Sequence, residues 1–374
     1  MNKSSVMQRP INTNKALDFF AGSGLVTAAL SPWFSVVWAN DVSPKKGLTY
    51  TANHGNSHFV LEDIRNIKGS MIPSATLAWA SFPCQDLSLA GKIKGIYASR
   101  SGLVWEWLRI LDELDQYPVI LVAENVLGLL SSNGGSGYID LHNALLERGY
   151  NVGPLLIDAK WFLPQSRPRV FVVAIRQSIP IDSFCSNAVS WAREGKVFND
   201  LSKRLDNWAA WNIERPRTPK QTLKRYVDLN APFPKKEWQQ HNLNLIPQER
   251  LDEFASSSEL IAAGYKRVRK NKLVLEIRFD GMAGCLRTPS GGSSKQLLIF
   301  KTSEGLKTRF ITIREAARLM GAPDSYELPG SYLDGYTAMG DAVAAPVVRH
   351  LAKYLLYPLA EKARNYVSEQ QKAI

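Results

Sequence analysis

The sequence contains few cysteines, no long hydrophobic run and no clustered histidines, and each absence excludes a class of protein. Its three cysteines, Cys84, Cys185 and Cys285, are widely spaced and odd in number, which excludes a disulfide framework and a zinc-binding pattern. No apolar stretch approaches the length of a membrane-spanning helix. The first residues lack the apolar segment of a secretion signal. The histidines form no helix-spaced ligand pair, because His54 and His58 flank Gly55-Asn56-Ser57, which a solvated loop explains better than a metal site. We therefore expect a cytoplasmic protein without a bound metal.

Acidic residues are scarcer than basic ones, so the chain is strongly positive. It has 46 lysines and arginines against 34 aspartates and glutamates, a formal net charge of +12. This excess favours a polyanionic partner, although charge predicts association and not chemistry. The 374 residues are 45% hydrophobic, which is enough for a sizeable core in two domains or in one enlarged domain.

Short apolar runs alternate with helix-like stretches in the first half of the chain. Five runs predict strands, at residues 16–20, 35–39, 77–81, 119–123 and 169–175. Helical patterns lie between them, for example at residues 102–114 and 139–148. Strands that alternate with helices predict an α/β fold, a doubly wound, Rossmann-like parallel sheet with helices on both faces.

The region between residues 177 and 280 has a different composition. Prolines cluster there, strands are hard to find and basic residues become more frequent. Its densest basic run is Tyr265–Lys272, which includes Lys266, Arg267 and Arg269. Such a run is either a solvated surface or a contact with phosphates, and its density favours the contact with phosphates. The region is interpreted as a smaller, loop-rich domain.

A thiol and a carboxyl group each follow a predicted strand. Cys84 lies in Phe82-Pro83-Cys84-Gln85, directly after an apolar run, and Pro83 stiffens the turn that carries it. Glu124 follows the next predicted strand. Ligands bind at the carboxyl ends of strands in open α/β sheets, so both groups are candidates for one site. The alternatives are an inert buried cysteine and a glutamate paired with a nearby arginine.

A glycine-rich turn, Ala21-Gly22-Ser23-Gly24, leads from the first predicted strand into a helical stretch. This arrangement lets a ligand approach the backbone and the helix N-terminus. Asp41 ends the second strand about 20 residues on, where a carboxylate can accept hydrogen bonds from ribose hydroxyls. Asp63 either accepts from an adenine amino group or caps a helix. The pattern predicts a nucleoside-bearing cofactor and does not distinguish NAD from S-adenosylmethionine, although the missing third glycine weighs against NAD.

In their order along the chain, these motifs resemble those of the DNA (cytosine-5)-methyltransferase family, prokaryotic type. The resemblance covers nearly the whole sequence. The motifs that carry it are Phe20-Ala-Gly-Ser-Gly24, Phe82-Pro-Cys-Gln85, Ser101-Gly-Leu103, Glu124-Asn-Val126, Gln165-Ser-Arg-Pro-Arg169, Arg314-Glu-Ala-Ala-Arg-Leu-Met-Gly321 and Gly340-Asp-Ala-Val343. The chain departs from the family at Asp341, where an asparagine is usual, but aspartate can accept the same hydrogen bonds.

The resemblance implies S-adenosyl-L-methionine as the cofactor. The residues that it assigns to cofactor binding are Phe20, Ala21, Gly22, Ser23, Gly24, Asp41, Asp63, Ile64, Pro83, Leu103, Asp341 and Ala342.

The resemblance also implies a covalent mechanism. The Cys84 thiolate attacks C6 of cytosine and makes C5 nucleophilic. Glu124, if protonated, donates to N3, while Arg167 or Arg169 stabilises charge on O2, and we favour Arg169. Asn125 is expected to orient the loop.

The target carbon lies inside a stacked duplex, so the base must be flipped out. Residues 88–101 are expected to form a loop that closes over it. The residues assigned to DNA contact are Gln85, Lys266, Arg267, Arg269 and Ser293. We expect a discontinuous catalytic domain (residues 1–178 and 328–374), a target-recognition domain (residues 179–327), a monomer, association with the nucleoid, and a role in restriction–modification or phage defence.

Three other functions compete with this interpretation. An RNA cytosine methyltransferase is disfavoured because the long basic insert suits duplex DNA. A non-catalytic DNA-binding regulator would not need intact Cys84, Glu124 and cofactor motifs. A nucleotide-dependent oxidoreductase leaves the Pro-Cys-Gln and Glu-Asn-Val motifs unexplained.

Overall fold

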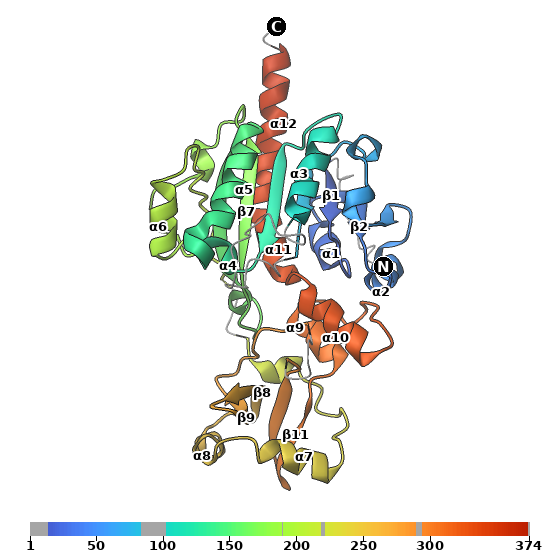
Figure 1. Ribbon diagram of the computed structural model, residues 1–374, viewed down its shortest axis with the longest axis vertical. Coiled ribbons are helices and arrows are strands. Elements are labelled where there is room, and N and C mark those ends of the chain that lie inside the picture. The colour runs from blue at the N-terminus through green and yellow to red at the C-terminus, as the bar shows by residue number, and fades with distance from the viewer. Residues whose placement is uncertain (1–13, 84–101, 189, 218–220, 289–293, 373–374) are drawn as a thin grey trace, which may run out of the picture.

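The chain forms a large and a small β-sheet, joined by a pair of short helices. The computed structural model describes residues 14–83, 102–188, 190–217, 221–288 and 294–372. In Figure 1 the large sheet and its helices occupy the upper part of the molecule and the small sheet the lower part. Helices α9 (Ile313–Leu319) and α10 (Tyr332–Asp341) lie between them. None of the helices in the described ranges has the length and apolarity needed to span a membrane.

The large sheet has seven strands in the order β3-β2-β1-β4-β5-β7-β6. They are β1 (Lys15–Phe19), β2 (Ser35–Asp41), β3 (Phe59–Leu61), β4 (Leu77–Ala80), β5 (Ile120–Asn125), β6 (Tyr150–Asp158) and β7 (Pro168–Arg176). The first five are parallel, whereas β7 pairs antiparallel with both β5 and β6. The sequence reverses direction across the sheet between β1 and β4, which is where ligands bind in doubly wound folds.

All five predicted strands of this sheet are confirmed, and β3 and β6 are two additional ones. Strand β6 contains Gly153 and Pro154, which interrupt a strand pattern in the sequence. It lies at the edge of the sheet, where a proline is tolerated because no further strand needs its missing N–H. The predicted doubly wound, parallel sheet is confirmed for five strands, and the β6–β7 hairpin adds two strands of which β7 is antiparallel to its neighbours.

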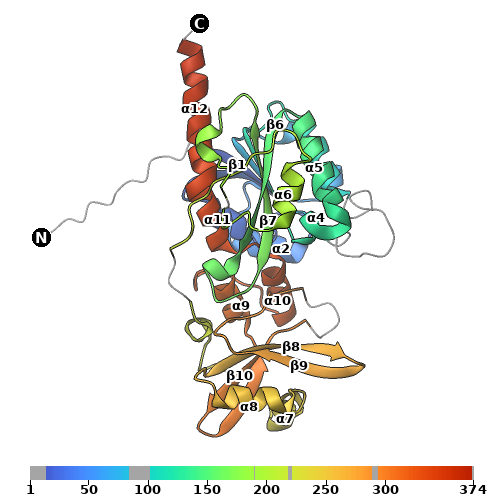
Figure 2. The same cartoon turned by 90° about the vertical axis from the view of Figure 1, so that its left-hand side faces the viewer.

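Helices cover both faces of the large sheet. One face carries α1 (Leu25–Leu30), α11 (Ala345–Leu351) and α12 (Tyr357–Lys372), and the other carries α3 (Leu103–Glu113), α4 (Gly128–Ser131), α5 (Ser136–Glu147) and α6 (Lys196–Ser202). Helix α11 continues into α12 through a π-helical turn, Ala352–Leu356. The C-terminal helices thus return to pack beside α1, the helix that follows the glycine turn (Figure 2). Helix α2 (Pro44–His54) follows β2.

The small sheet is antiparallel, with the strand order β11-β10-β8-β9. Its strands are β8 (Ile261–Arg269), β9 (Lys272–Arg278), β10 (Leu297–Thr302) and β11 (Gly305–Phe310). Side chains of one face, including Leu275 and Ile277, pack with residues of α7 (Lys236–Leu243) and α8 (Gln248–Ser256). The basic run Tyr265–Lys272 therefore forms strands, contrary to the loop-rich interpretation. Charges on both of its faces hide the alternation that identifies a strand.

Residues 179–213 lie against the large sheet, although the sequence analysis grouped them with the recognition domain. Trp211 is buried, and its Nε1 donates to the carbonyl oxygens of Gly153 (3.1 Å) and Val173 (3.0 Å). Trp208 forms a bridge with Val152 of β6. The Trp211 indole and the Val152–Trp208 bridge thus anchor this segment on β6 and β7. No local sequence pattern reveals these contacts.

Glu315 connects the small sheet to the helices that lead back to the large one. Its carboxylate pairs with the buried guanidinium of Arg309 at 2.7 Å and accepts from the backbone N–H of Asp228, also at 2.7 Å. It also completes a capping box with Thr312 at the start of α9. Breaking a buried pair of this kind costs several kcal/mol because one charge stays unpaired. Glu315 therefore fixes how the small sheet is attached.

Candidate active site

Candidate site residues follow four neighbouring strands of the large sheet at their carboxyl ends. The glycine turn follows β1, Asp41 ends β2, Phe82 and Pro83 follow β4, and Glu124 lies near the end of β5. Because β1, β2, β4 and β5 are parallel, these ends meet along one edge. The structure therefore brings the predicted cofactor residues and the predicted acid together.

The glycine turn has an unusual backbone conformation. Phe20, Gly22 and Gly24 have φ values of 57°, 58° and 86°. A left-handed phenylalanine is uncommon and marks a constrained, functional turn. A Cβ at Gly24 would lie 2.6 Å from the ring of His54, whereas one at Gly22 would meet no atom closer than 4.0 Å. Gly24 thus serves packing, while the turn at Gly22 leaves room for a ligand.

Asp41 is held against the glycine turn. One carboxylate oxygen accepts from the backbone N–H of Gly22 at 3.0 Å, and the other accepts from that of Ser43 at 2.8 Å. Both bonds fix the carboxylate orientation and leave lone pairs for a further donor. This suits an acceptor for ribose hydroxyls.

Asp63 caps the 3-10 turn Ile64–Asn66. Its side chain accepts from the backbone N–H of Arg65 at 3.0 Å and pairs with the Arg65 guanidinium at 2.6 Å, and this hydrogen bonding lowers the pKa of Asp63. Asp63 therefore caps this turn, which is one of the two alternatives from the sequence. Its lowered pKa keeps the carboxylate ionised. Ile64 is buried beside it, and Leu103 begins α3.

Asp18, in β1, is a buried polar residue that the sequence analysis did not single out. Burial raises the pKa of its carboxyl to about 7, and the Thr27 hydroxyl donates to it at 2.7 Å. Hydrogen bonds continue from Thr27 to Tyr50 and from Tyr50 to His58, each 3.0 Å long. The sequence feature that could have identified Asp18 is its place as an acidic residue within the apolar run 16–20.

Two buried polar atoms beside the turn lack a hydrogen-bond partner among the described residues. They are the second carboxyl oxygen of Asp18 and the Ser23 hydroxyl. Buried polar groups are normally paired, so these two atoms have hydrogen-bonding capacity that the described residues do not use. This unmet capacity, together with the open turn at Gly22 and the oriented Asp41, fits a polar, nucleoside-bearing group.

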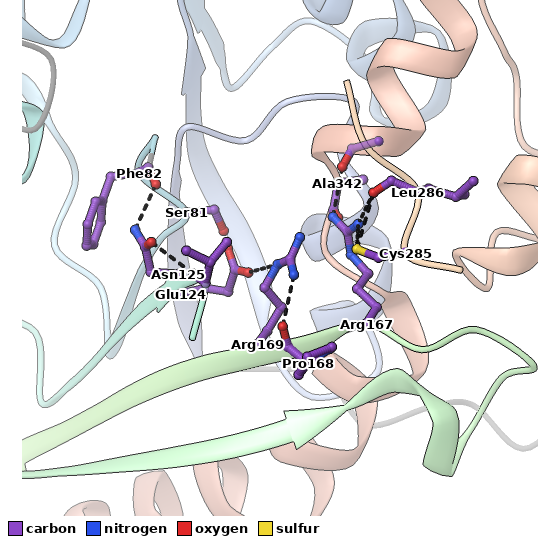
Figure 3. A network of polar contacts seen from close by, with 12 residues as sticks. Ser81, Phe82, Glu124, Asn125, Arg167, Pro168, Arg169, Cys285, Leu286 and Ala342 are labelled. Atoms are coloured by element: carbon purple, nitrogen blue, oxygen red, sulfur yellow. Dashed lines mark hydrogen bonds and ion pairs between the residues drawn. The ribbon is translucent and has the colours of Figure 1, made fainter. Parts of the chain in front are cut away.

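Glu124 is buried at the end of β5, beside Arg169 of β7. The distance from its carboxylate to Arg169 Nε is 3.2 Å (Figure 3). Burial raises the pKa of Glu124, and this outweighs the opposing effects of Arg169 and Arg167. The ion-pair alternative from the sequence is present, yet the environment also favours a protonated acid. Both properties suit a proton donor.

Asn125 connects β5 to the segment that carries the predicted nucleophile. Its Nδ2 donates to the carbonyl oxygen of Phe82 at 3.2 Å, and its Oδ1 accepts from the Val126 N–H at 2.9 Å (Figure 3). Pro83 is exposed directly after Phe82. Asn125 therefore fixes Phe82, two residues before Cys84 in the sequence. Cys84 and Gln85 themselves lie outside the described residues, as do residues 88–101, including Ser101, and Ser293.

Arg167, directly before β7, and Arg169, within β7, have different environments. Arg167 is buried, and its guanidinium donates to the carbonyl oxygens of Leu286 (2.6 Å), Gly340 (2.9 Å) and Ala342 (2.7 Å). Burial lowers its pKa to about 10. These bonds tie together segments remote in sequence. Of these two arginines, only Arg169 contacts Glu124.

Gln165 makes comparable connections beneath the site. Its Nε2 donates to the Leu319 carbonyl at 2.6 Å, and its Oε1 accepts from the Leu286 N–H at 3.1 Å. Gln165 and Arg167 together hold the segment around Leu286 and the ends of α9 and α10. Their roles are visible only in the structure, because their partners are backbone carbonyls and amides.

Asp341, at the end of α10, forms an ion pair with Lys46 of α2 at 2.6 Å and a hydrogen bond with the Thr288 hydroxyl. The sequence analysis did not identify Lys46. The next residue, Ala342, offers its carbonyl to Arg167.

The DNA-contact candidates on β8 divide between two faces of the hairpin. Arg267 and Arg269 share one face, and Lys266 lies on the other. Arg269 pairs with Glu276 at 2.5 Å, whereas Arg267 lies over the Tyr265 ring, 5.3 Å from its centre. The hairpin projects beyond α7 and α8 (Figure 2).

A cavity of about 260 Å³ lies between this hairpin and the segment 284–287. Its lining includes Arg267, Arg278, Cys285 and Arg287. Arg278 and Arg287 were missed from the sequence because they lie outside the dense basic run. In the described ranges, no three His, Cys, Asp or Glu side chains form a group that could hold a metal ion.

Comparison with solved structures defines the class of protein first. The Entamoeba histolytica methyltransferase EhMeth superimposes with a TM-score of 0.64 at 18% identity, over 92% of this chain and 98% of that one. The S. pombe Dnmt2 methyltransferase does so with a TM-score of 0.61 at 19% identity, over 92% and 99%. At these identities the likeness shows a shared fold, which is an α/β methyltransferase fold.

The sequence then defines the family. The model of the C-5 cytosine-specific DNA methylases matches residues 14–356, and the chain belongs to this family of DNA methyltransferases. The Type II methyltransferase M.FnuDI of Fusobacterium nucleatum is 27% identical over 368 residues, 96% of this chain and 99% of that protein. M.MthTI of Methanothermobacter thermautotrophicus, also a Type II methyltransferase, is 28% identical over 348 residues, 90% and 94% of the two chains.

Proposed function

We propose that this protein transfers a methyl group from S-adenosylmethionine to C5 of a specific cytosine in double-stranded DNA. The observation that carries the proposal is the environment of Glu124. This carboxyl is buried, its pKa is raised by burial, and it lies beside Arg169. Asn125, the next residue, binds the carbonyl oxygen of Phe82, two residues before Cys84 in the sequence. The acid Glu124 thus has a cation, Arg169, on one side and the residue that fixes Phe82 next to it in the strand.

The chain's own groups account for activation of the base. The Cys84 thiolate forms a bond from Sγ to C6, and the electron pair of the C5–C6 double bond becomes available at C5. Glu124 gives its proton to N3, and Arg169 stabilises charge at O2. When bound, S-adenosylmethionine supplies the methyl group and retains the electron pair of the broken bond. The C5 proton then leaves to a base, the thiolate is expelled, and the N3 proton returns to Glu124.

Arg167 is proposed as a positioning residue and not as the contact to O2. Its two terminal nitrogens already donate to three carbonyl oxygens, and its Nε, which has no partner among the described residues, is buried. The proposed roles of the two arginines in the motif therefore differ.

The cofactor is proposed to bind at the glycine turn. Asp41 would accept from the ribose hydroxyls, and Asp63 would accept from the adenine amino group. Ile64, Pro83 and Leu103 would supply apolar contacts. The turn from Phe20 to Gly24 would pass close to the ligand, and Asp341 and Ala342 would close the other side.

The target base is proposed to be flipped into the site from duplex DNA. The small sheet, with its charged hairpin face, would serve as the reader within a recognition domain of residues 214–327. The remaining residues, including the segment before residue 214 that lies on the large sheet, would form the catalytic domain. The Type II names of the relatives favour a restriction–modification role. We propose that a single copy of the chain suffices.

A duplex that carries 5-fluorocytosine at the target tests the mechanism, because the fluorine blocks the final elimination. Wild type with S-adenosylmethionine should form a denaturant-resistant adduct on this DNA, and Cys84→Ala should form none. Bisulfite sequencing of DNA from cells that express each protein identifies the site and serves as the activity control. Methylation by Cys84→Ala, with no adduct in wild type, would refute the covalent mechanism.

A further inference from the structure

Lys46 and Asp341 form an ion pair between two segments that flank the candidate cofactor site. Lys46 lies in the first turns of α2, five residues after Asp41, and Asp341 ends α10. Their Nζ and Oδ2 atoms are 2.6 Å apart, and the two side chains are 24% and 34% exposed. The pair is therefore shielded from water to a large degree, unlike most surface ion pairs.

The Asp41 carboxylate also acts electrostatically on Lys46, whose direct ion pair is with Asp341. Burial alone would lower the pKa of the Lys46 ammonium, but the two carboxylates together raise it. Lys46 therefore stays protonated in this environment. Two carboxylates and one ammonium leave a single net negative charge at this edge of the sheet.

The pair also explains how an aspartate is tolerated at position 341. An asparagine there would be neutral and would need no cation. An aspartate adds a charge near Asp41, and like charges in a partly buried site repel one another. The ammonium of Lys46 removes that repulsion, while the Asp341 carboxylate keeps a lone pair for the Thr288 hydroxyl.

We propose that Lys46 is a positioning residue of the cofactor site, which neutralises Asp341 so that Asp41 is the one uncompensated carboxylate beside the bound nucleoside. This inference rests on the proposed cofactor. It predicts that removing one charge of the Lys46–Asp341 pair changes the affinities of two ligands by different amounts when the ligands differ in charge. S-adenosylmethionine is a sulfonium and carries one more positive charge than S-adenosylhomocysteine, the product of methyl transfer.

The two single substitutions should therefore have opposite effects. Lys46→Met leaves two uncompensated carboxylates, which favours the sulfonium over the neutral thioether. Asp341→Asn leaves an unpaired ammonium, which disfavours the sulfonium. We expect the ratio of the two dissociation constants to move by roughly 3- to 10-fold in opposite directions, given a unit charge acting across a partly hydrated site. The double variant should restore the wild-type ratio.

Isothermal titration calorimetry with each ligand, at low ionic strength, measures these ratios directly. The matched control is Lys45→Met with Asp334→Asn, which removes an ion pair of 2.8 Å between the same two helices. Lys45 is 71% exposed, so this control should leave the ratio unchanged. Because a ratio is compared, a general loss of packing that weakens both ligands equally does not imitate the expected result.

The outcomes separate this inference from the proposed function. If wild type binds neither ligand, the cofactor assignment is wrong and the inference fails with it. If wild type binds both ligands and either single substitution leaves their ratio unchanged, only the inference is overturned. A double variant that keeps the ratio of one single variant would likewise show that the two charges do not act as a pair.

Discussion

The two sheets use polar residues in opposite ways. In the large sheet, the inner strands are buried, and the polar groups Asp18, Glu124 and Asn125 are buried near strand ends. In the small sheet, one face of the β8–β9 hairpin packs on a core, while Arg267 and Arg269 emerge on the other. Burial changes the chemistry of a few groups, whereas exposure leaves many cations available to a polyanion. The proposed function therefore assigns the reaction chemistry to the large sheet and the DNA affinity to the small one.

Among substitutions that test this difference between the sheets, the largest effect is expected at Glu124. Glu124→Gln keeps the size and a donor but cannot transfer a proton, so methyl transfer should slow by roughly 100-fold or more. Binding of DNA should change little, because the small sheet is untouched. Single-turnover kinetics measures the chemical step, and a filter-binding or anisotropy titration measures affinity. A normal single-turnover rate with weakened DNA binding would reassign Glu124 to DNA contact.

The same contrast explains how much the sequence could predict. Buried strands are continuous apolar runs, so β4 and β5 were found, and with them the places of Pro83 and Glu124. The hairpin was missed because its outward face and its distal end are charged. Contacts between distant segments, such as Lys46 with Asp341 or Trp211 with β6, depend on the fold and leave no local pattern.

A second, smaller effect should appear in the stability of the large sheet. The pKa of Asp18 is about 7 in the folded protein and near its ordinary value of 3.8 when unfolded. At a pH between these two pKa values, the Asp18 carboxyl is protonated in the folded protein and ionised in the unfolded chain. The free energy of unfolding should therefore fall as the pH rises from about 4 to about 7.

Asp18→Asn removes this dependence because an amide does not titrate. Relative to wild type, the variant should be close in stability at pH 4 and more stable by roughly 1–3 kcal/mol at pH 8. Urea unfolding of both proteins without cofactor, at several pH values, measures the difference. The comparison between variants cancels the titration of other groups. A difference that is the same at every pH would contradict the raised pKa.

The smallest effects are expected on the small sheet, where each cation contributes a little. Arg267 lines the cavity beside Arg278 and Arg287, and within the described residues no carboxylate pairs with it. Lys266, its neighbour in sequence, points to the opposite face of the hairpin. If DNA lies along the face of Arg267, then Arg267→Gln should weaken binding several-fold and reduce the salt dependence by about one phosphate contact.

Lys266→Gln removes the same charge from the same strand and is the matched control, expected to have less effect on both quantities. Both are measured by DNA titrations over a range of salt concentrations, with single-turnover rates at saturating DNA expected to stay near wild type. Loss of sequence preference in Arg267→Gln, with an unchanged salt slope, would assign Arg267 to a base instead of a phosphate. An equal or larger loss in Lys266→Gln would mean that both faces of the hairpin contact DNA, and the one-sided surface would have to be abandoned. The hairpin thus offers two adjacent cations on opposite faces of the sheet, of which only Arg267 lines the cavity.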